Sequence, residues 1–153
     1  MAMTMQGEVT LPAGREAVWA ALNDPSVLKA CIPGCQELEK VSDTEFQATA
    51  KLAVGPVKAT FKGSVKLTDL APPESYTITG EGQGGVAGWA KGGAKVRLED
   101  MDGGTKLVYD VEANVGGKIA QLGGRLINGV AKKYADEFFA NFAKILSPAE
   151  TTA

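Results

Sequence analysis

The chain has 153 residues, of which 44% are apolar and 22% are charged, so it can fold as one domain that buries roughly 68–70% of its unfolded surface. Sixteen basic and eighteen acidic residues give a formal charge of −2, which supplies no field strong enough to hold a nucleic acid by counterion release. Histidine is absent, which excludes histidine-based triads, histidine-ligated zinc and the usual acid/base group at neutral pH.

The first elements in chain order are a strand and two short helices. Residues 3–11 alternate loosely between apolar and polar side chains, which predicts a strand. Residues 15–22 change to helical spacing, and Asn23-Asp24-Pro25 ends that helix and starts a second one over residues 25–30. Ile32-Pro33-Gly34 then predicts a turn, because proline fixes its own φ and glycine permits a positive φ.

Residues 36–115 predict six further strands arranged as a meander. Apolar and polar residues alternate clearly in three of these strands, so one face is wet and the other is buried, as in an antiparallel sheet covered on one side. The strands are separated by five breaks: Ser42-Asp43, Gly55-Pro56, Ala71-Pro72-Pro73, Gly84-Gly85 and Asp102-Gly103-Gly104.

Residues 118–146 contain no proline and predict one helix about 40 Å long, long enough to cross the sheet. Its apolar positions recur at steps of three and four, as in a helix with one buried face. They are Ala120, Gly123, Ile127, Val130, Tyr134, Phe138, Phe142 and Ile145.

This order of elements predicts an α+β fold, in which a curved antiparallel sheet of about seven strands wraps around a long C-terminal helix. Residues 1–146 form a single domain and residues 147–153 a short polar tail. The predicted register buries five large side chains on the inward face or on the helix stripe: Phe46, Phe61, Val96, Val111 and Phe138.

Neither end of the chain carries a targeting pattern, and no stretch approaches the ~18–20 apolar residues of a membrane span, so we expect a cytosolic protein. The two cysteines, Cys31 and Cys35, cannot complete a four-ligand metal site without histidine, and their spacing differs from the redox C-x-x-C. We interpret them as small buried apolar residues near a turn.

Small residues at the middle of the inward sheet face suggest a cavity. The helix stripe is slender before Val130 and bulky after it, so we expect the space under the first half of the helix to be hollow and that under the second half to be filled. Gly123 and Gly124 would each cost ~1 kcal/mol inside a helix, and either a ligand or close packing against the sheet explains them. If a ligand is the reason, Gly123→Leu fills the space without disturbing the fold.

We therefore predict an apolar site that opens beside the first half of the helix. Two alternatives remain: the second short helix could cover Leu122 and Leu126, and Trp89 could plug the core. The candidate lining residues are Ile32, Phe61, Tyr76, Trp89, Tyr109, Ile119, Leu122, Gly123, Leu126 and Ile127.

The sequence offers little for catalysis. Tyr76 and Tyr109 have inward parity and could each donate a hydrogen bond into a cavity, but no inward Asp or Glu accompanies them. Three functions stay open on the residues alone: a carrier of an apolar ligand, a cyclase- or hydratase-like enzyme, and a protein adaptor that uses an exposed apolar patch.

Specific words in the chain resemble the CoxG family of carbon monoxide dehydrogenase subunits, a branch of the START-like (SRPBCC) superfamily with the helix-grip fold. The resemblance covers residues 3–146. Its most specific words are the Cys31-Ile32-Pro33-Gly34-Cys35 turn and the run from Gly116 to Gly123; weaker ones are Val18-Trp19-x-x-Leu22-x-x-Pro25 and Gly55-Pro56-Val57-x-x-x-Phe61-x-Gly63.

The resemblance implies a non-catalytic accessory protein of the aerobic molybdenum carbon monoxide dehydrogenase system. It implies an apolar cavity for a lipid-like ligand such as a quinone, and no cofactor or metal. The implied partners are that ligand and carbon monoxide dehydrogenase or a related molybdenum hydroxylase, with transient membrane contact and without an integral membrane segment.

Overall fold

Seven antiparallel strands form one sheet in the order β1-β7-β6-β5-β4-β3-β2. The structure is a computed structural model that describes residues 2–146; the predicted polar tail at 147–153 lies outside the described residues. The elements in chain order are β1 (Ala2–Leu11), α1 (Arg15–Leu22), α2 (Pro25–Cys31), β2 (Cys35–Ser42), β3 (Glu45–Val54), β4 (Val57–Ala71), β5 (Ser75–Gln83), the 3₁₀ helix η1 (Gly85–Ala87), β6 (Trp89–Met101), β7 (Gly104–Gly116), the 3₁₀ helix η2 (Lys118–Leu122) and α3 (Gly124–Leu146).

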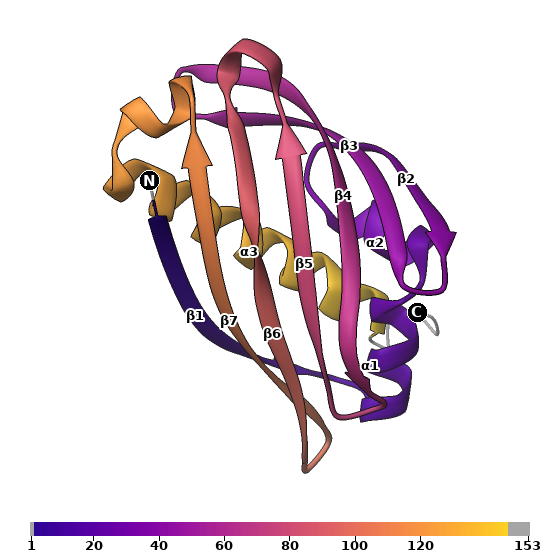
Figure 1. Cartoon of the computed structure of the whole chain (residues 1–153). Coiled ribbons are helices and arrows are strands. Elements are labelled where there is room, and N and C mark those ends of the chain that lie inside the picture. Colours follow the sequence, from indigo (N-terminus) through magenta and orange to yellow (C-terminus); the bar gives the residue numbers. More distant parts are fainter. Residues whose placement is uncertain (1, 147–153) are drawn as a thin grey trace.

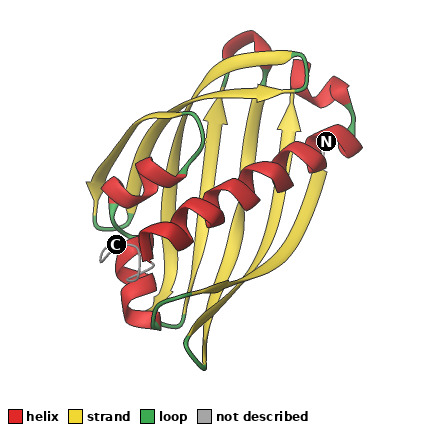
Figure 2. Ribbon diagram, turned by 180° about the vertical axis from the view of Figure 1, so that it is seen from behind, coloured by secondary structure: helices red, strands yellow, loops and turns green. Residues whose placement is uncertain are grey.

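The sheet curves around α3, which crosses its concave face diagonally (Figures 1 and 2). The helix starts beside η2 and ends near α1 and α2. Near that end Asn141 Nδ2 donates a hydrogen bond to the carbonyl oxygen of Cys31 at 3.1 Å, which ties α3 to the end of α2. The predicted fold, an antiparallel sheet gripping a long C-terminal helix, is confirmed.

The alternation of side chains sets which face of each strand packs against α3. Of the five residues predicted to be buried, Phe46 and Val96 are buried, with 4% and 6% of their surface exposed. Phe61, Val111 and Phe138 are only partly buried, because they line hollows between sheet and helix. The predicted register is therefore right, since a slip by one residue would reverse every side chain of a strand.

Two apolar clusters hold the layers together. The larger one lies under the second half of α3 and includes Leu11, Val18, Leu107 and Phe142, each 1% exposed or less. The smaller cluster lies under η2 and the start of α3, and its buried members are Ala87, Val115, Ile119 and Ile127.

The prediction of one unbroken helix over 118–146 is wrong. A short 3₁₀ helix, η2, ends at Leu122, and Gly123 follows it with φ 91° and ψ 153°, before α3 begins at Gly124. That backbone conformation is open to glycine and strained for residues with a Cβ. Gly123 fits the helical spacing of its neighbours, which is why the pattern alone did not show a joint here.

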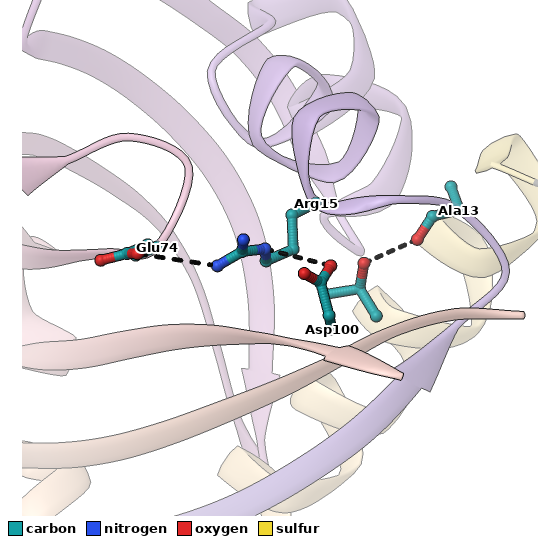
Figure 3. Close-up of polar contacts among 5 residues, drawn as sticks. Ala13, Arg15, Glu74 and Asp100 are labelled. Atoms are coloured by element: carbon teal, nitrogen blue, oxygen red, sulfur yellow. Dashed lines mark hydrogen bonds and ion pairs between the residues drawn. The ribbon is translucent and has the colours of Figure 1, made fainter. Parts of the chain in front are cut away.

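Polar contacts fasten the start of α1 to the sheet (Figure 3). Arg15 Nε lies 3.1 Å from Asp100 Oδ1, and Arg15 Nη1 lies 3.9 Å from Glu74 Oε1. Both carboxylates are exposed, so these ion pairs contribute little stability. The fully buried Thr105 hydroxyl donates to the carbonyl oxygen of Ala13 at 2.6 Å, which satisfies both groups away from water.

One side chain of α3 completes the edge of the sheet. The pairing of β2 with β3 begins at Cys35 and Ala50, so Ala53 lies beyond the reach of β2. The Tyr134 hydroxyl accepts a hydrogen bond from the Ala53 N–H and donates one to the Ala53 carbonyl, each at 3.0 Å. Tyr134, which the sequence assigned to the core, therefore joins α3 to the free edge of β3.

Candidate functional site

An open apolar pocket of about 380 Å³ lies on the concave face of the sheet. Its floor consists of small residues on the inward positions of β3 to β7, including Ala48, Gly63, Gly80 and Ala113. Side chains that end at Cα or Cβ leave the face of the sheet bare, and the hollow follows from that.

Neighbouring strands, and not the helix, explain two of the glycines in this floor. An added Cβ at Gly63 would come within 2.5 Å of the Glu81 carbonyl oxygen, and one at Gly92 would meet the Glu112 carbonyl. Glycine thus lets the strands approach closely where the sheet bends. The space above them is left free.

A second, more enclosed cavity of about 260 Å³ lies deeper under the second half of α3. The aromatic rings of Phe138 and Phe139 contribute to its lining from the helix, and α1 and α2 contribute Leu22 and Leu28. The remaining lining residues are Ile32, Leu38, Phe46, Ala48, Val65, Leu67, Tyr76, Ile78, Val96, Leu107 and Tyr109.

The two hollows adjoin along the centre of the sheet. Ala48, Val65 and Ile78, on β3, β4 and β5, line both of them. An elongated molecule can therefore pass from the open pocket over these three residues into the enclosed cavity. Together the hollows fall within the roughly 300–1,000 Å³ range of small-molecule sites.

The structure brings some of the predicted lining residues together and separates others. Ile32, Tyr76 and Tyr109 line the enclosed cavity, and Phe61 lines the open pocket. The other six lie outside both linings: Trp89, Ile119, Leu122, Gly123, Leu126 and Ile127.

These six residues occupy the end of the sheet where α3 begins. Ile119 and Ile127 fill that end as members of the smaller apolar cluster. Trp89 alternates with Ala90 of the pocket floor and so faces the convex side, where its indole lies against Gly116. Leu126 is 38% exposed and lies against the turn at Gly55.

The expectation that bulky residues fill the space under the second half of α3 is wrong. Phe138 and Phe139 pack edge to face, with ring centroids 5.1 Å apart, and Phe139 stacks on Tyr109 at 5.4 Å. This cluster covers the enclosed cavity without filling it. The bulky helix side chains signalled an aromatic wall, but their number alone does not distinguish a wall from a filled core.

The ionisable groups in the enclosed cavity are two tyrosines. Burial raises the pKa of the Tyr76 hydroxyl well above its ordinary value of 10, so it stays neutral. Burial also raises the pKa of Tyr109, and the carboxylate of Asp136 adds to this effect. Both phenols are therefore hydrogen-bond donors at neutral pH, able to bind a carbonyl or hydroxyl oxygen of an apolar molecule.

The two thiols lie near the α2–β2 turn and are both free. Cys31 is fully buried, as predicted, whereas Cys35 is partly buried and donates to the Glu37 carbonyl oxygen at 3.4 Å. Burial raises the pKa of both cysteines. A raised pKa keeps a thiol protonated and a poor nucleophile.

Two negative observations apply to the described part of the chain, residues 2–146. No group of three or more cysteine or carboxylate side chains there could hold a metal ion. No helix in this range is both long and apolar enough to cross a bilayer.

Comparison with solved structures places the fold among several relatives. A conserved protein from Geobacillus kaustophilus is 33% identical, with a TM-score of 0.88 over 94% of this chain and 95% of its own. The ZhuI aromatase/cyclase from Streptomyces sp. R1128 is 13% identical, with a TM-score of 0.70 over 95% and 94% of the two chains. The protein TTHA0849 from Thermus thermophilus is 13% identical, with a TM-score of 0.71 over 99% and 100%. The last two likenesses show the fold alone.

No curated protein matches the chain. The model of the carbon monoxide dehydrogenase CoxG family, however, matches residues 7–147, nearly the whole chain. The resemblance carried by the Cys31–Cys35 turn and the run from Gly116 to Gly123 is thereby confirmed, and the chain belongs to the CoxG family of carbon monoxide dehydrogenase subunits.

Proposed function

We propose that the protein binds a lipid-like small molecule, such as a quinone, in the joined hollows between the sheet and α3. The observation that carries this proposal is the composition of the enclosed cavity. Among the described residues, Tyr76 and Tyr109 bring the only polar side chains to its lining; every other lining residue is aliphatic or phenylalanine. Burial of apolar surface then drives binding at roughly 25 cal/mol per Å², and the two phenols orient a carbonyl-bearing ring.

The proposed role is that of an accessory protein for aerobic molybdenum carbon monoxide dehydrogenase. Family membership supports this system, because the family takes its name from a subunit of that enzyme. A non-catalytic role is supported by the lining of the enclosed cavity, where within residues 2–146 no carboxylate accompanies the two neutral phenols. Acid/base chemistry of the cyclase type needs a group that exchanges a proton near neutral pH.

The test is an organic extract of the purified protein, analysed by mass spectrometry and compared with an extract of a cavity-filled variant. We expect an isoprenoid or acyl chain from the wild type. A fluorescent apolar probe should enter the empty protein and be displaced by a short-chain quinone. A clean extract together with no probe uptake would contradict ligand binding and favour the protein adaptor.

The choice between carrier and enzyme is tested separately. Tyr76→Phe removes one phenol and keeps the shape of the cavity, so the apolar probe should still bind while a quinone binds more weakly. Chemical conversion of a bound polyketide-like or quinone substrate that Tyr76→Phe abolishes would contradict the non-catalytic role.

A further inference from the structure

The end of the molecule where α3 begins presents apolar side chains to solvent. Val86, at the tip of η1, is 94% exposed, although its neighbour Ala87 is 2% exposed. Trp89 and Leu126 are 39% and 38% exposed. Burial of these side chains would remove contacts with water that the isolated chain leaves in place.

Contacts between four segments make this end one surface. Leu126 lies against Gly55 in the β3–β4 turn, and Trp89 lies against Gly116 at the end of β7. The backbones of Gly88 and Gly117 also touch, since a Cβ added at Gly117 would lie 2.5 Å from the Cα of Gly88. Figure 1 shows η1, η2 and the β3–β4 turn at the same end of the sheet. We call residues 53–60, 82–92 and 114–129 the apical surface.

The charges of the apical surface have a single sign. It contains four basic residues and no acidic one, and all four are exposed: Lys58, Lys91, Lys118 and Arg125. Because the whole chain has a formal charge of −2, the remainder carries −6. Apolar and basic groups are thus segregated together at one end of an otherwise acidic protein.

Other exposed apolar residues lack this setting. Leu70 is 40% exposed but follows Asp69, and Met101 is 43% exposed between Asp100 and Asp102. An acidic rim repels anionic headgroups. Exposure alone therefore does not single out the apical surface; the combination with uniform positive charge does.

We propose that the apical surface docks on an anionic lipid bilayer, with Val86 inserted among the acyl chains and the four cations against the headgroups. Charge complementarity favours lipid, because a bilayer offers many anionic groups over an apolar interior, and tryptophan prefers the boundary between them. The open pocket includes Phe61, Gly82 and Ala90, which adjoin this end. On the proposed function, on which this last step rests, a ligand moves between the bilayer and the cavity by that route.

The experiment is co-sedimentation with vesicles of phosphatidylcholine alone or mixed in equal parts with phosphatidylglycerol. We expect binding to the mixed vesicles only, and its loss as salt is raised. Val86→Glu should abolish it, whereas Leu70→Glu, which places the same charge at a comparably exposed site, should not. Lys118→Gln/Arg125→Gln should weaken binding roughly fivefold per charge removed, and Lys29→Gln/Lys144→Gln should have a smaller effect.

Uptake of the apolar probe without vesicles, measured on the same variants, separates this proposal from the proposed function. Unchanged uptake by Val86→Glu with lost sedimentation supports docking through the apical surface. Equal binding to both kinds of vesicle, or equal losses for Val86→Glu and Leu70→Glu, would overturn it. Absence of vesicle binding would also overturn it and assign the surface to an acidic protein partner.

Discussion

Single residues of α3 that look alike in the sequence have different surroundings. Phe142 is fully buried in the larger apolar cluster, and its ring stacks on that of Phe138 with centroids 5.7 Å apart. Phe138 is only partly buried and lines the enclosed cavity. The first therefore serves the core, while the second serves both the core and the wall of the site.

Truncation of these two rings should separate the roles. Phe142→Ala leaves a void in a packed region and should lower the free energy of unfolding by ~3–5 kcal/mol. Phe138→Ala should cost clearly less, because one side of its ring already faces a hollow, and it should change the affinity for an apolar probe. Denaturant unfolding and probe titration measure both effects. Equal losses of stability would contradict the difference in packing.

A further prediction concerns Tyr76 and alkaline pH. Its pKa is raised in the folded protein, while an unfolded tyrosine ionises near pH 10. The unfolded chain thus loses a proton that the folded protein keeps, so stability is fully present below about pH 10 and falls as the pH rises further. Tyr76→Phe should flatten this decline in unfolding experiments run across the alkaline range. An unchanged slope would show that Tyr76 ionises freely in the folded state.

At the scale of elements, the junction between η2 and α3 sets where the long helix starts. Gly123 has φ 91°, and no heavy atom lies within 4 Å of a Cβ built there, so strain and not crowding opposes substitution. The reverse holds at Gly129, which lies inside α3 at a helical φ with open space around its Cβ position.

The two glycines should respond in opposite directions to alanine. Gly123→Ala should destabilise the protein by about 1–3 kcal/mol, because alanine rarely adopts that backbone conformation. Gly129→Ala should stabilise it by about 0.5–1 kcal/mol, since glycine weakens a helix interior. Thermal unfolding of both variants checks this. A stable Gly123→Ala protein would restore the continuous helix that the sequence predicted.

The strands and most helix bounds were predictable because each depends on a local pattern. Alternation in β3, β4 and β7 fixed which face is inward, and Asn23-Asp24-Pro25 marked the junction of α1 and α2. The joint at Gly123 depends on a backbone angle that the spacing of side chains does not encode. The position of the enclosed cavity depends on how far apart the sheet and the Phe138 ring lie, which is a property of the assembled layers.

At the scale of the whole molecule, the curved sheet and the diagonal helix divide the space between them into two parts. The smaller apolar cluster fills the end under η2, and the larger one packs around Phe142. Between these clusters the open pocket and the enclosed cavity meet. The site is thus the space that the two cores leave unfilled.

The last prediction tests whether the two hollows act as one site. Ala48 of β3 lines both, and its neighbour across the β3–β4 pairing is Gly63, which leaves room for a larger side chain. Ala48→Leu should block the passage, so a long-chain fluorescent fatty acid should lose most of its affinity while a compact probe still enters the enclosed cavity. Ala50→Leu is the matched control, because Ala50 lines only the open pocket. Its leucine should weaken the long-chain probe less, since the chain can still cross Ala48. Leucine at either position fills existing space, so unfolding should shift by less than the ~1–3 kcal/mol of an overpacked core. Equal affinity of both variants for both probes would mean that the hollows bind independently.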